Sequence, residues 1–416
     1  MVTMRTYVFV HLPEGPVPAG LLTMTDEPRN RFATFAYGRR YLERPDRLAV
    51  DPVALPLPEA GTSVTYRTEE GFAVFNGIRD AAPDGWGQYL MYKAMGDRTP
   101  SEIDLILASG EHRVGCLAFG PTPERPQRIT PWGEGAAPGE HFTLGELAEA
   151  AERAQHVEEL DENLRRLLTA GSSLGGARPK AATEIADQSW IAKFEARNDS
   201  FPECRVEYAT MRLAAECGLN VPALGLRRVL ERDIYLIERF DRVHHGNWME
   251  RRHFASGLTM LGAHESEVSR YSYADLAGAL RQLGTEVRAD LHELFRRMVF
   301  NILVTNDDDH LRNHGFLFDG KGWRLSPLYD VVPKPQVGLD RRLVLGVGPQ
   351  GRNATLENAL AGAAVFDLGE EAAAKMIAQM RKIVAARWEQ LFEGAGLGRA
   401  DRGRFATCFR LAIDQE

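Results

Sequence analysis

Cysteine is scarce in this 416-residue sequence: there are four, widely scattered, and no two form a CxxC pair. This spacing argues against a disulfide framework or a structural zinc site and is typical of reduced thiols. Long apolar runs are missing too, so we expect no signal peptide or membrane-spanning segment, and we expect the protein in the cytoplasm. Lys and Arg total 50 against 58 Asp and Glu, a formal net charge of −8. The chain therefore lacks the basic excess that autonomous binding to nucleic acid or membrane surfaces usually needs.

Lysine is the rarer of the two basic residues, with seven copies among those 50. Because an ammonium and a guanidinium are not interchangeable at a phosphate, a lysine retained in such a chain is informative about function. Between residues 94 and 320 only Lys180 and Lys193 occur.

The length predicts two or three packed units. Residues 1–120 are expected to form a small, mainly β subdomain, including a strand over GFAVFNG (71–77) and a hairpin over ILASGEHRVGCLAFG (106–120). In the same region, APDGWGQYLMYKAM predicts a turn followed by a helix. A Pro/Gly-rich connector follows over 121–142, for which a long surface loop inside one domain is the alternative. A β-rich segment is expected over 143–245 and a helical segment over 246–416.

An acidic loop, NDDDHLRN (306–313), gives the strongest chemical signal. Asp308 and Asn313 are five residues apart, as are the proton-accepting Asp and the magnesium-binding Asn of a protein-kinase catalytic loop. A predicted hairpin over GFLFDGKGWRL then leads to Asp330, which lies where a second metal-binding carboxylate is needed. A solvated turn or helix cap is the structural alternative for such a loop.

A glycine-rich stretch, SSLGGARPK (172–180), is the second signal. Its backbone N–H groups can form a nest for phosphate, although the Walker A pattern is absent. We take Gly175, Gly176, Ala177 and Lys180 as candidate phosphate-binding residues, with a flexible loop as the alternative.

Lys193 follows this stretch on a predicted strand, where kinases keep the lysine that binds the α- and β-phosphates of ATP. An exposed strand lysine is the alternative. The helix predicted to begin near Glu207 offers that residue as a salt-bridge partner for Lys193, with Glu203 as a competing candidate. Two further strands lead to IERFDR, where Glu238 to Phe240 would meet adenine and where Arg239 and Asp241 are expected to form local salt bridges.

The order of these parts is that of a kinase: glycine loop, strand lysine, helix glutamate, two strands, helical lobe, Asp–Asn loop, hairpin and aspartate. The sequence therefore predicts an α+β, two-lobed protein-kinase-like fold with a small mainly β N-terminal subdomain, a β-rich N-lobe and an all-helical C-lobe. Its predicted activity is ATP-dependent phosphotransfer.

The motifs SSLGGARPKA, WIAKF, IERFDR, TNDDDHLRNHGFL and LSPLYDVVP closely resemble the HipA family, serine/threonine kinases that are toxins of bacterial type II toxin–antitoxin modules. The resemblance implies ATP and Mg²⁺ as cofactors, Asp308 as catalytic base, and Asn313 and Asp330 as magnesium ligands. It further implies that Lys193 binds ATP phosphates and that Ser173, beside Ser172, is autophosphorylated, which switches the kinase off.

The same resemblance implies three partners. These are a HipB-like helix-turn-helix antitoxin, operator DNA reached mainly through that antitoxin, and a protein substrate whose family precedent is an aminoacyl-tRNA synthetase, above all the glutamyl enzyme.

Three other functions compete with this one. A nucleotide-binding pseudokinase would keep the fold and act as an interaction protein. A small-molecule phosphotransferase would keep phosphoryl transfer but use an acceptor such as an aminoglycoside. A metal-dependent hydrolase would use Asp307, Asp308, His310 and His314.

Overall fold

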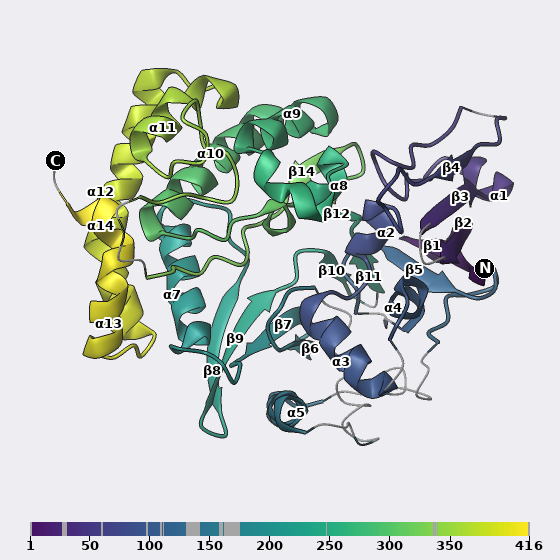
Figure 1. Ribbon diagram of the computed structural model, residues 1–416, viewed down its shortest axis with the longest axis horizontal. Coiled ribbons are helices and arrows are strands. Elements are labelled where there is room, and N and C mark those ends of the chain that lie inside the picture. Colours follow the sequence, from purple (N-terminus) through teal and green to yellow (C-terminus); the bar gives the residue numbers. More distant parts are fainter. Residues whose placement is uncertain are drawn as a thin grey trace. The chain divides into compact units, whose positions relative to one another are not determined.

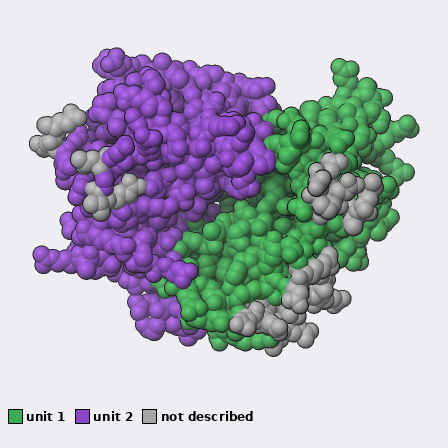
Figure 2. Space-filling model, viewed as in Figure 1, with its two compact units in different colours: residues 1–197, 239–255 green, residues 198–238, 256–416 purple. Residues whose placement is uncertain are grey.

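The computed structural model describes residues 2–26, 31–59, 61–96, 99–108, 110, 112–129, 142–157, 161, 175–246, 248–335, 338 and 340–414. These residues form two compact units, shown in two colours in Figure 2. Unit 1 contains residues 1–197 and 239–255, and unit 2 contains residues 198–238 and 256–416. The predicted domain boundaries near residues 120, 142 and 245 stay predictions.

Unit 1 is built on a five-stranded sheet with the order β4-β3-β2-β1-β5, in which neighbouring strands are antiparallel (Figure 1). Side chains of β3 alternate between half-buried and buried, as expected where one sheet face covers a core. The strands are β1 (Val2–Leu12), β2 (Gly15–Asp26), β3 (Phe32–Tyr37), β4 (Thr65–Arg67) and β5 (Leu117–Gly120).

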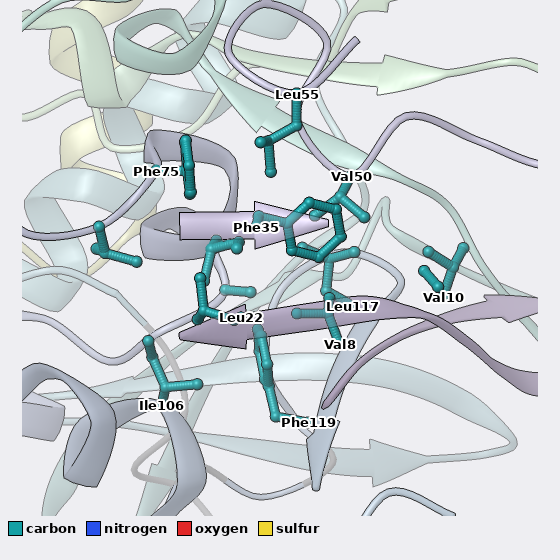
Figure 3. Packing of buried hydrophobic residues seen from close by; sticks show 14 of the residues in the cluster. Val8, Val10, Leu22, Phe35, Val50, Leu55, Phe75, Ile106, Leu117 and Phe119 are labelled. Carbon is teal, nitrogen blue, oxygen red and sulfur yellow. The ribbon is translucent and has the colours of Figure 1, made fainter. Parts of the chain in front are cut away.

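Apolar side chains from this sheet and from the helices beside it form the core of unit 1 (Figure 3). Phe35 is fully buried and lies among side chains from several strands and loops. Burying an aromatic side chain of this kind contributes roughly 1.5–3 kcal/mol relative to leaving it exposed. Among its described residues, unit 1 has the helices α1 (Arg39–Leu42), α2 (Asn76–Asp80), α3 (Gly85–Met95), α4 (Glu102–Ala108) and α5 (Leu144–His156).

Two antiparallel hairpins complete unit 1. The first consists of β6 (Lys180–Ile185) and β7 (Gln188–Phe194), and the second of β10 (Arg242–His245) and β11 (Trp248–Arg251).

Unit 2 is mainly helical but contains two antiparallel hairpins. One of them, formed by residues 315–325, lies within residues 246–416, so the predicted C-lobe is not all-helical. The longest helix of unit 2, α12, buries Trp388 and Phe392 on one face, and Trp388 stacks on Phe409 with ring centroids 4.6 Å apart. The hairpins are β8 (Leu224–Val229) with β9 (Arg232–Glu238) and β13 (Gly315–Phe318) with β14 (Trp323–Leu325). The helices are α7 (Glu203–Glu216), α8 (Gly257–Leu261), α9 (Tyr273–Leu283), α10 (Val287–Val304), α11 (Leu356–Ala361), α12 (Glu370–Gly394), α13 (Arg399–Phe405) and α14 (Arg410–Ile413), and β12 (Phe254–Ser256) precedes α8.

Two local predictions in the first 120 residues are wrong. Residues 71–75 form no strand, and α2 begins at Asn76. The predicted first arm of the hairpin at 106–120 is instead the end of α4, whose side chains enter the core of unit 1. Short apolar runs lack the periodicity that separates a strand from a buried helix.

All four cysteines are buried and none forms a disulfide, as predicted. Among the residues that the structure describes, no helix has the length and apolar character required to cross a membrane.

Candidate functional site

The acidic loop begins where α10 ends, at Thr305. Thr305 has a left-handed backbone (φ +57°), and its hydroxyl donates to the carbonyl of Cys408 at 2.6 Å while accepting from Arg341 at 2.7 Å. A β-branched residue in this conformation is strained, and these bonds hold it there. The turn fixes the direction in which the following aspartates leave the helix.

The structure brings Asp308 and Asn313 together. The side-chain amide of Asn313 donates from Nδ2 to the main-chain carbonyl of Asp308 at 3.1 Å, through a 3₁₀ turn over Leu311–Asn313. Asn313 is buried, whereas the carboxylate of Asp308 is 59% exposed and can meet an incoming hydroxyl group. The bond uses Nδ2, so Oδ1 of Asn313 is the atom that could bind a metal ion.

Asp330 belongs to the same unit, and its chain neighbour is bonded to the acidic loop. The hydroxyl of Tyr329 donates to the carbonyl of Arg312 at 2.6 Å, so each of the bonded residues is a chain neighbour of a predicted magnesium ligand. Asp330 has φ +63°, a left-handed conformation that is uncommon outside glycine and frequent at functional sites. Carboxylate and amide oxygens are the ligands that Mg²⁺ prefers, so Asn313 and Asp330 fit that ion.

Lys334 contacts the acidic loop, although none of the sequence motifs predicted a role for it. Its Nζ lies 3.0 Å from Oδ2 of Asp308 and 3.7 Å from Oδ1 of Asp307. Its main-chain N–H donates to the carbonyl of Thr305 at 2.9 Å, which fixes its position beside the loop. The scarcity of lysine, together with a proline on each side of Lys334, was the available signal.

A buried polar network supports the loop from behind. The carboxylate of Asp309 accepts a hydrogen bond from the hydroxyl of Tyr273 and lies 2.9 Å from Nε2 of His314, and Asn301 donates to the Tyr273 hydroxyl at 3.2 Å. Burial favours the neutral acid, but His314 and these hydrogen bonds hold the pKa of Asp309 below its usual value. Asp309 is thus a support for its neighbour Asp308.

The position of His314 in this network is relevant to the competing function of a metal-dependent hydrolase. His314 is buried, and the carboxylate that its Nε2 contacts is that of Asp309. Within the described ranges, no three His, Cys, Asp or Glu side chains gather to hold a metal ion. The geometry does not favour the hydrolase.

Glu207 lies on the buried face of α7, which begins at Glu203 rather than near Glu207. Burial raises the pKa of Tyr235, and the charges of Glu207 and Asp330 raise it further, so both carboxylates are near this ring in unit 2. Glu207 is 1% exposed, whereas Glu203 is half-buried. Because a fully buried glutamate is rare unless it is paired, Glu207 is the better candidate for an ion pair. Pairing with Lys193 stays a prediction, because the two residues belong to different units.

The predicted phosphate-binding residues of unit 1 gather at one end of the β6–β7 hairpin. Lys180 and Lys193 are direct partners in its register, so their side chains share one face of the ribbon, and both are buried. This excludes the exposed strand lysine as an explanation of Lys193. Nζ of Lys180 donates to the carbonyl of Gly175 at 2.5 Å, so the glycine-rich stretch and the two cations are adjacent. Backbone N–H groups and ammonium groups in one place fit the phosphates of ATP.

Ser172 and Ser173 lie outside the described residues, so the autophosphorylation site stays a prediction. Gly175, Gly176 and Ala177 are described, and Gly176 has φ +96°.

The predicted adenine segment lies at the point where the chain passes from unit 2 to unit 1, between Glu238 and Arg239. The N–H of Glu238 is bonded to the carbonyl of Ala223 at 2.9 Å. The adenine contacts of Glu238 and Phe240 stay predictions.

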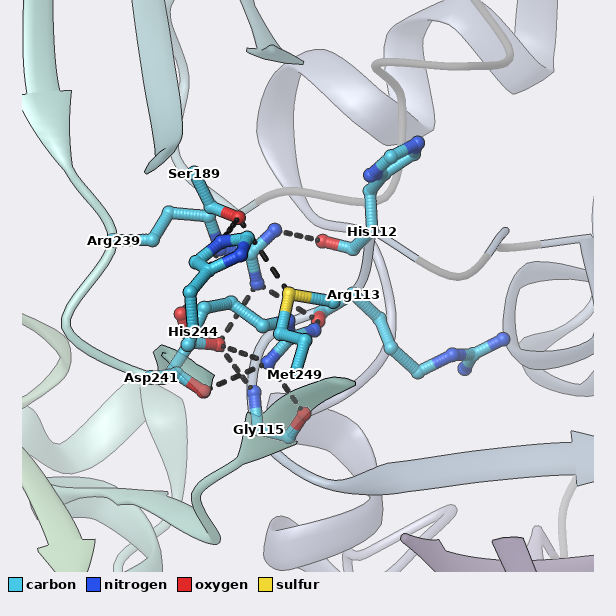
Figure 4. Close-up of polar contacts among 9 residues, drawn as sticks. His112, Arg113, Gly115, Ser189, Arg239, Asp241, His244 and Met249 are labelled. Atoms are coloured by element: carbon cyan, nitrogen blue, oxygen red, sulfur yellow. Dashed lines mark hydrogen bonds and ion pairs between the residues drawn. The ribbon is translucent and has the colours of Figure 1, made fainter. Parts of the chain in front are cut away.

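Arg239 and Asp241 form the predicted local salt bridge, 2.8 Å long and fully buried (Figure 4). Arg242 joins the same carboxylate at 2.9 Å, and Asp241 accepts from the N–H of Gly115 at 2.8 Å. Arg239 and Arg242 both donate to the carbonyl of Arg113. These residues are therefore structural, since they tie the 112–115 loop to the start of β10.

Comparison with known proteins finds relatives of this chain. A family model described as the HipA-like C-terminal domain matches residues 172–388. A Sinorhizobium fredii protein named "Putative kinase Y4mE" is 24% identical over 348 residues, which cover 75% of this chain and 76% of that protein. A Haemophilus influenzae protein named "Putative kinase" is 28% identical over 188 residues, 40% of this chain and 55% of that protein.

Among solved structures, the complex of HipA, HipB and operator DNA from the Shewanella oneidensis MR-1 toxin–antitoxin system contains a similar chain. The TM-score is 0.68 at 17% identity, and the match covers 98% of this chain and 96% of that one. Since the family model spans more than half of the sequence and this structural match spans nearly all of it, the protein belongs to the HipA-like C-terminal domain family and has the kinase-like fold of HipA.

Proposed function

We propose that this protein is an ATP-dependent serine/threonine protein kinase and the toxin of a HipBA-like toxin–antitoxin system. The observation that carries the proposal is the hydrogen-bonded pair of Asp308 and Asn313, which combines an exposed carboxylate with a buried amide. Asp330, whose neighbour Tyr329 is bonded to the same loop, completes the set. A pseudokinase commonly lacks one member of this set.

Each residue has a separate role in the proposed reaction. The carboxylate of Asp308 accepts the proton of the acceptor hydroxyl as the new bond to phosphorus forms. Oδ1 of Asn313 and the carboxylate of Asp330 would hold Mg²⁺, and Lys193 with the glycine-rich stretch would hold the phosphates. Bound ATP supplies the phosphoryl group and leaves as ADP.

The proposed partners follow from the family. The Shewanella structure contains HipB and operator DNA, and we propose a HipB-like antitoxin for this chain, with DNA reached mainly through it. An acidic chain suits a kinase that leaves DNA binding to its partner. For the protein substrate, an aminoacyl-tRNA synthetase such as the glutamyl enzyme is the first candidate to test.

Intact-mass measurement after incubation with Mg-ATP tests the proposal on wild type, Asp308→Asn and Ser173→Ala. A gain of about 80 Da, one phosphoryl group, in wild type alone is the expected result. A gain that persists in Ser173→Ala but not in Asp308→Asn would keep the kinase and move the modified residue, with Ser172 next. An unphosphorylated wild type that binds ATP but gains no mass and labels no protein would overturn the proposal in favour of a pseudokinase. Labelling of aminoglycosides or other small molecules alone would favour the small-molecule phosphotransferase.

A further inference from the structure

The first turn of α3 contacts the glycine-rich stretch within unit 1. This turn contains Asp84, Gly85 and Trp86, and it belongs to the first 120 residues, to which the proposed kinase chemistry gives no role. Asp84 is 92 residues from Gly176 along the chain.

Both backbone polar groups of Gly176 are bonded to this turn. The N–H of Gly176 donates to Oδ1 of Asp84, and the N–H of Trp86 donates to the carbonyl of Gly176 at 3.0 Å. A glycine with φ +96° has many alternative conformations, so two bonds to a helix end restrict it strongly.

The approach of the two segments requires glycine at residue 85. A Cβ added to Gly85 would lie 2.6 Å from the carbonyl oxygen of Gly176 and 2.8 Å from Cα of Ala177. Both contacts are with backbone, which cannot move aside as a flexible side chain can. Gly85 also has φ +40°, in the left-handed region that disfavours other residues.

Lys180 adds a further restraint, the 2.5 Å bond from Nζ to the carbonyl of Gly175. Gly175 and Gly176 are thus bonded both to the start of α3 and to a buried lysine on the hairpin that also contains Lys193.

We propose that Asp84, Gly85 and Trp86 form a clasp that positions the glycine-rich stretch for nucleotide phosphates. This inference rests on the proposed function, and it makes part of the N-terminal region a component of nucleotide binding. A glycine-rich segment loses much conformational entropy when it orders around a ligand. A segment already ordered by the clasp loses less, and so it binds phosphate more tightly.

The same contact admits an opposite effect, since the Asp84 carboxylate could compete with a phosphate for the N–H of Gly176. Asn at residue 84 keeps an oxygen acceptor and removes the charge, whereas Ala removes both. The two variants therefore separate positioning from competition.

The test combines the ATP dissociation constant, measured by calorimetry, with amide hydrogen exchange of residues 175–180 in the absence of nucleotide. The variants are Asp84→Ala, Asp84→Asn and Gly85→Ala, with Tyr92→Ala on an exposed part of α3 as control. Thermal unfolding verifies that each variant is folded.

Positioning predicts that Asp84→Ala and Gly85→Ala each weaken ATP binding by about tenfold and speed exchange, the loss of one restraint of ordinary strength. Asp84→Asn and the control stay within a few-fold of wild type, and kcat at saturating ATP changes little. Tighter ATP binding in both Asp84 variants, or unchanged exchange and affinity, would overturn the clasp. Wild type that binds no ATP would instead refute the proposed function, while the exchange rates would still report whether the turn orders the stretch.

Discussion

Nζ of Lys334 lies 3.0 Å from Oδ2 of Asp308, the proposed catalytic base, although 26 residues separate them in the chain. The main-chain bond from Lys334 to Thr305 fixes the lysine at the exit of α10. A cation fixed beside the carboxylate can neutralise charge on the transferring phosphoryl group.

Lys334→Met is therefore expected to lower kcat roughly 100-fold, the effect typical of removing one donor that acts on the transition state. ATP affinity should change only a few-fold, and Lys334→Arg should restore part of the rate because it keeps the charge. Steady-state kinetics measures both, with Lys321→Met, an exposed lysine in the β13–β14 turn, as the control. Equal rates for the Met variants would show that Lys334 has no part in the reaction.

Tyr273→Phe removes the hydroxyl that joins Asp309 to Asn301 behind the acidic loop. Because both partners are buried, we expect the free energy of unfolding to fall by about 1–3 kcal/mol. Urea denaturation measures this, and Tyr271→Phe, two residues away and half-buried, is the matched control. A loss no greater than in the control would contradict the supporting role of the network.

Asp241→Asn leaves two buried guanidinium groups, those of Arg239 and Arg242, without their shared carboxylate. Breaking a buried ion pair by removing one partner costs about 3–5 kcal/mol. The comparison is Asp46→Asn, whose exposed carboxylate pairs with Arg44 and should matter by less than about 1 kcal/mol. Thermal and urea unfolding of the two variants should differ clearly, and similar losses would refute the structural role of the Asp241 cluster.

His253 provides a pH dependence in unit 1. Burial lowers its pKa to about 4, against the effect of the Ala49 carbonyl, which lies 2.8 Å from Nε2. The unfolded chain binds a proton near pH 6.5 that the folded chain does not bind until about pH 4, so stability is full above pH 7 and falls as the pH drops through this window. The loss attributable to His253 is on the order of 3 kcal/mol.

His253→Gln keeps a donor near the Ala49 carbonyl and removes the titration. Urea unfolding of both proteins at several pH values between 4 and 7 should show the smaller pH slope in the variant. Parallel slopes would mean that His253 does not titrate differently in the folded and unfolded states.

Local patterns in the sequence predicted the parts of the site that depend on short-range geometry. The Asp308–Asn313 spacing, the tight turn at Gly320 and the strand carrying Lys193 are all properties of fewer than ten consecutive residues. The helix after Asp84 was also predicted, from the turn that precedes it.

Contacts between distant segments were missed, because no local pattern encodes them. The bonds from Lys334 to Asp308, from Tyr273 to Asp309 and from Gly176 to Asp84 join residues 26, 36 and 92 positions apart. In each case one partner had drawn attention by its chemistry, and the fold supplied the other.

Phosphoryl transfer by Asp308→Asn, compared with wild type at saturating Mg-ATP, tests the central claim most directly when ATP affinity is measured on the same samples. If the Asp308 carboxylate accepts the proton of the acceptor, the transfer rate should fall by at least about 100-fold while the dissociation constant of ATP stays within a few-fold. A variant that transfers phosphate at the wild-type rate would contradict Asp308 as the catalytic base and the account built on it.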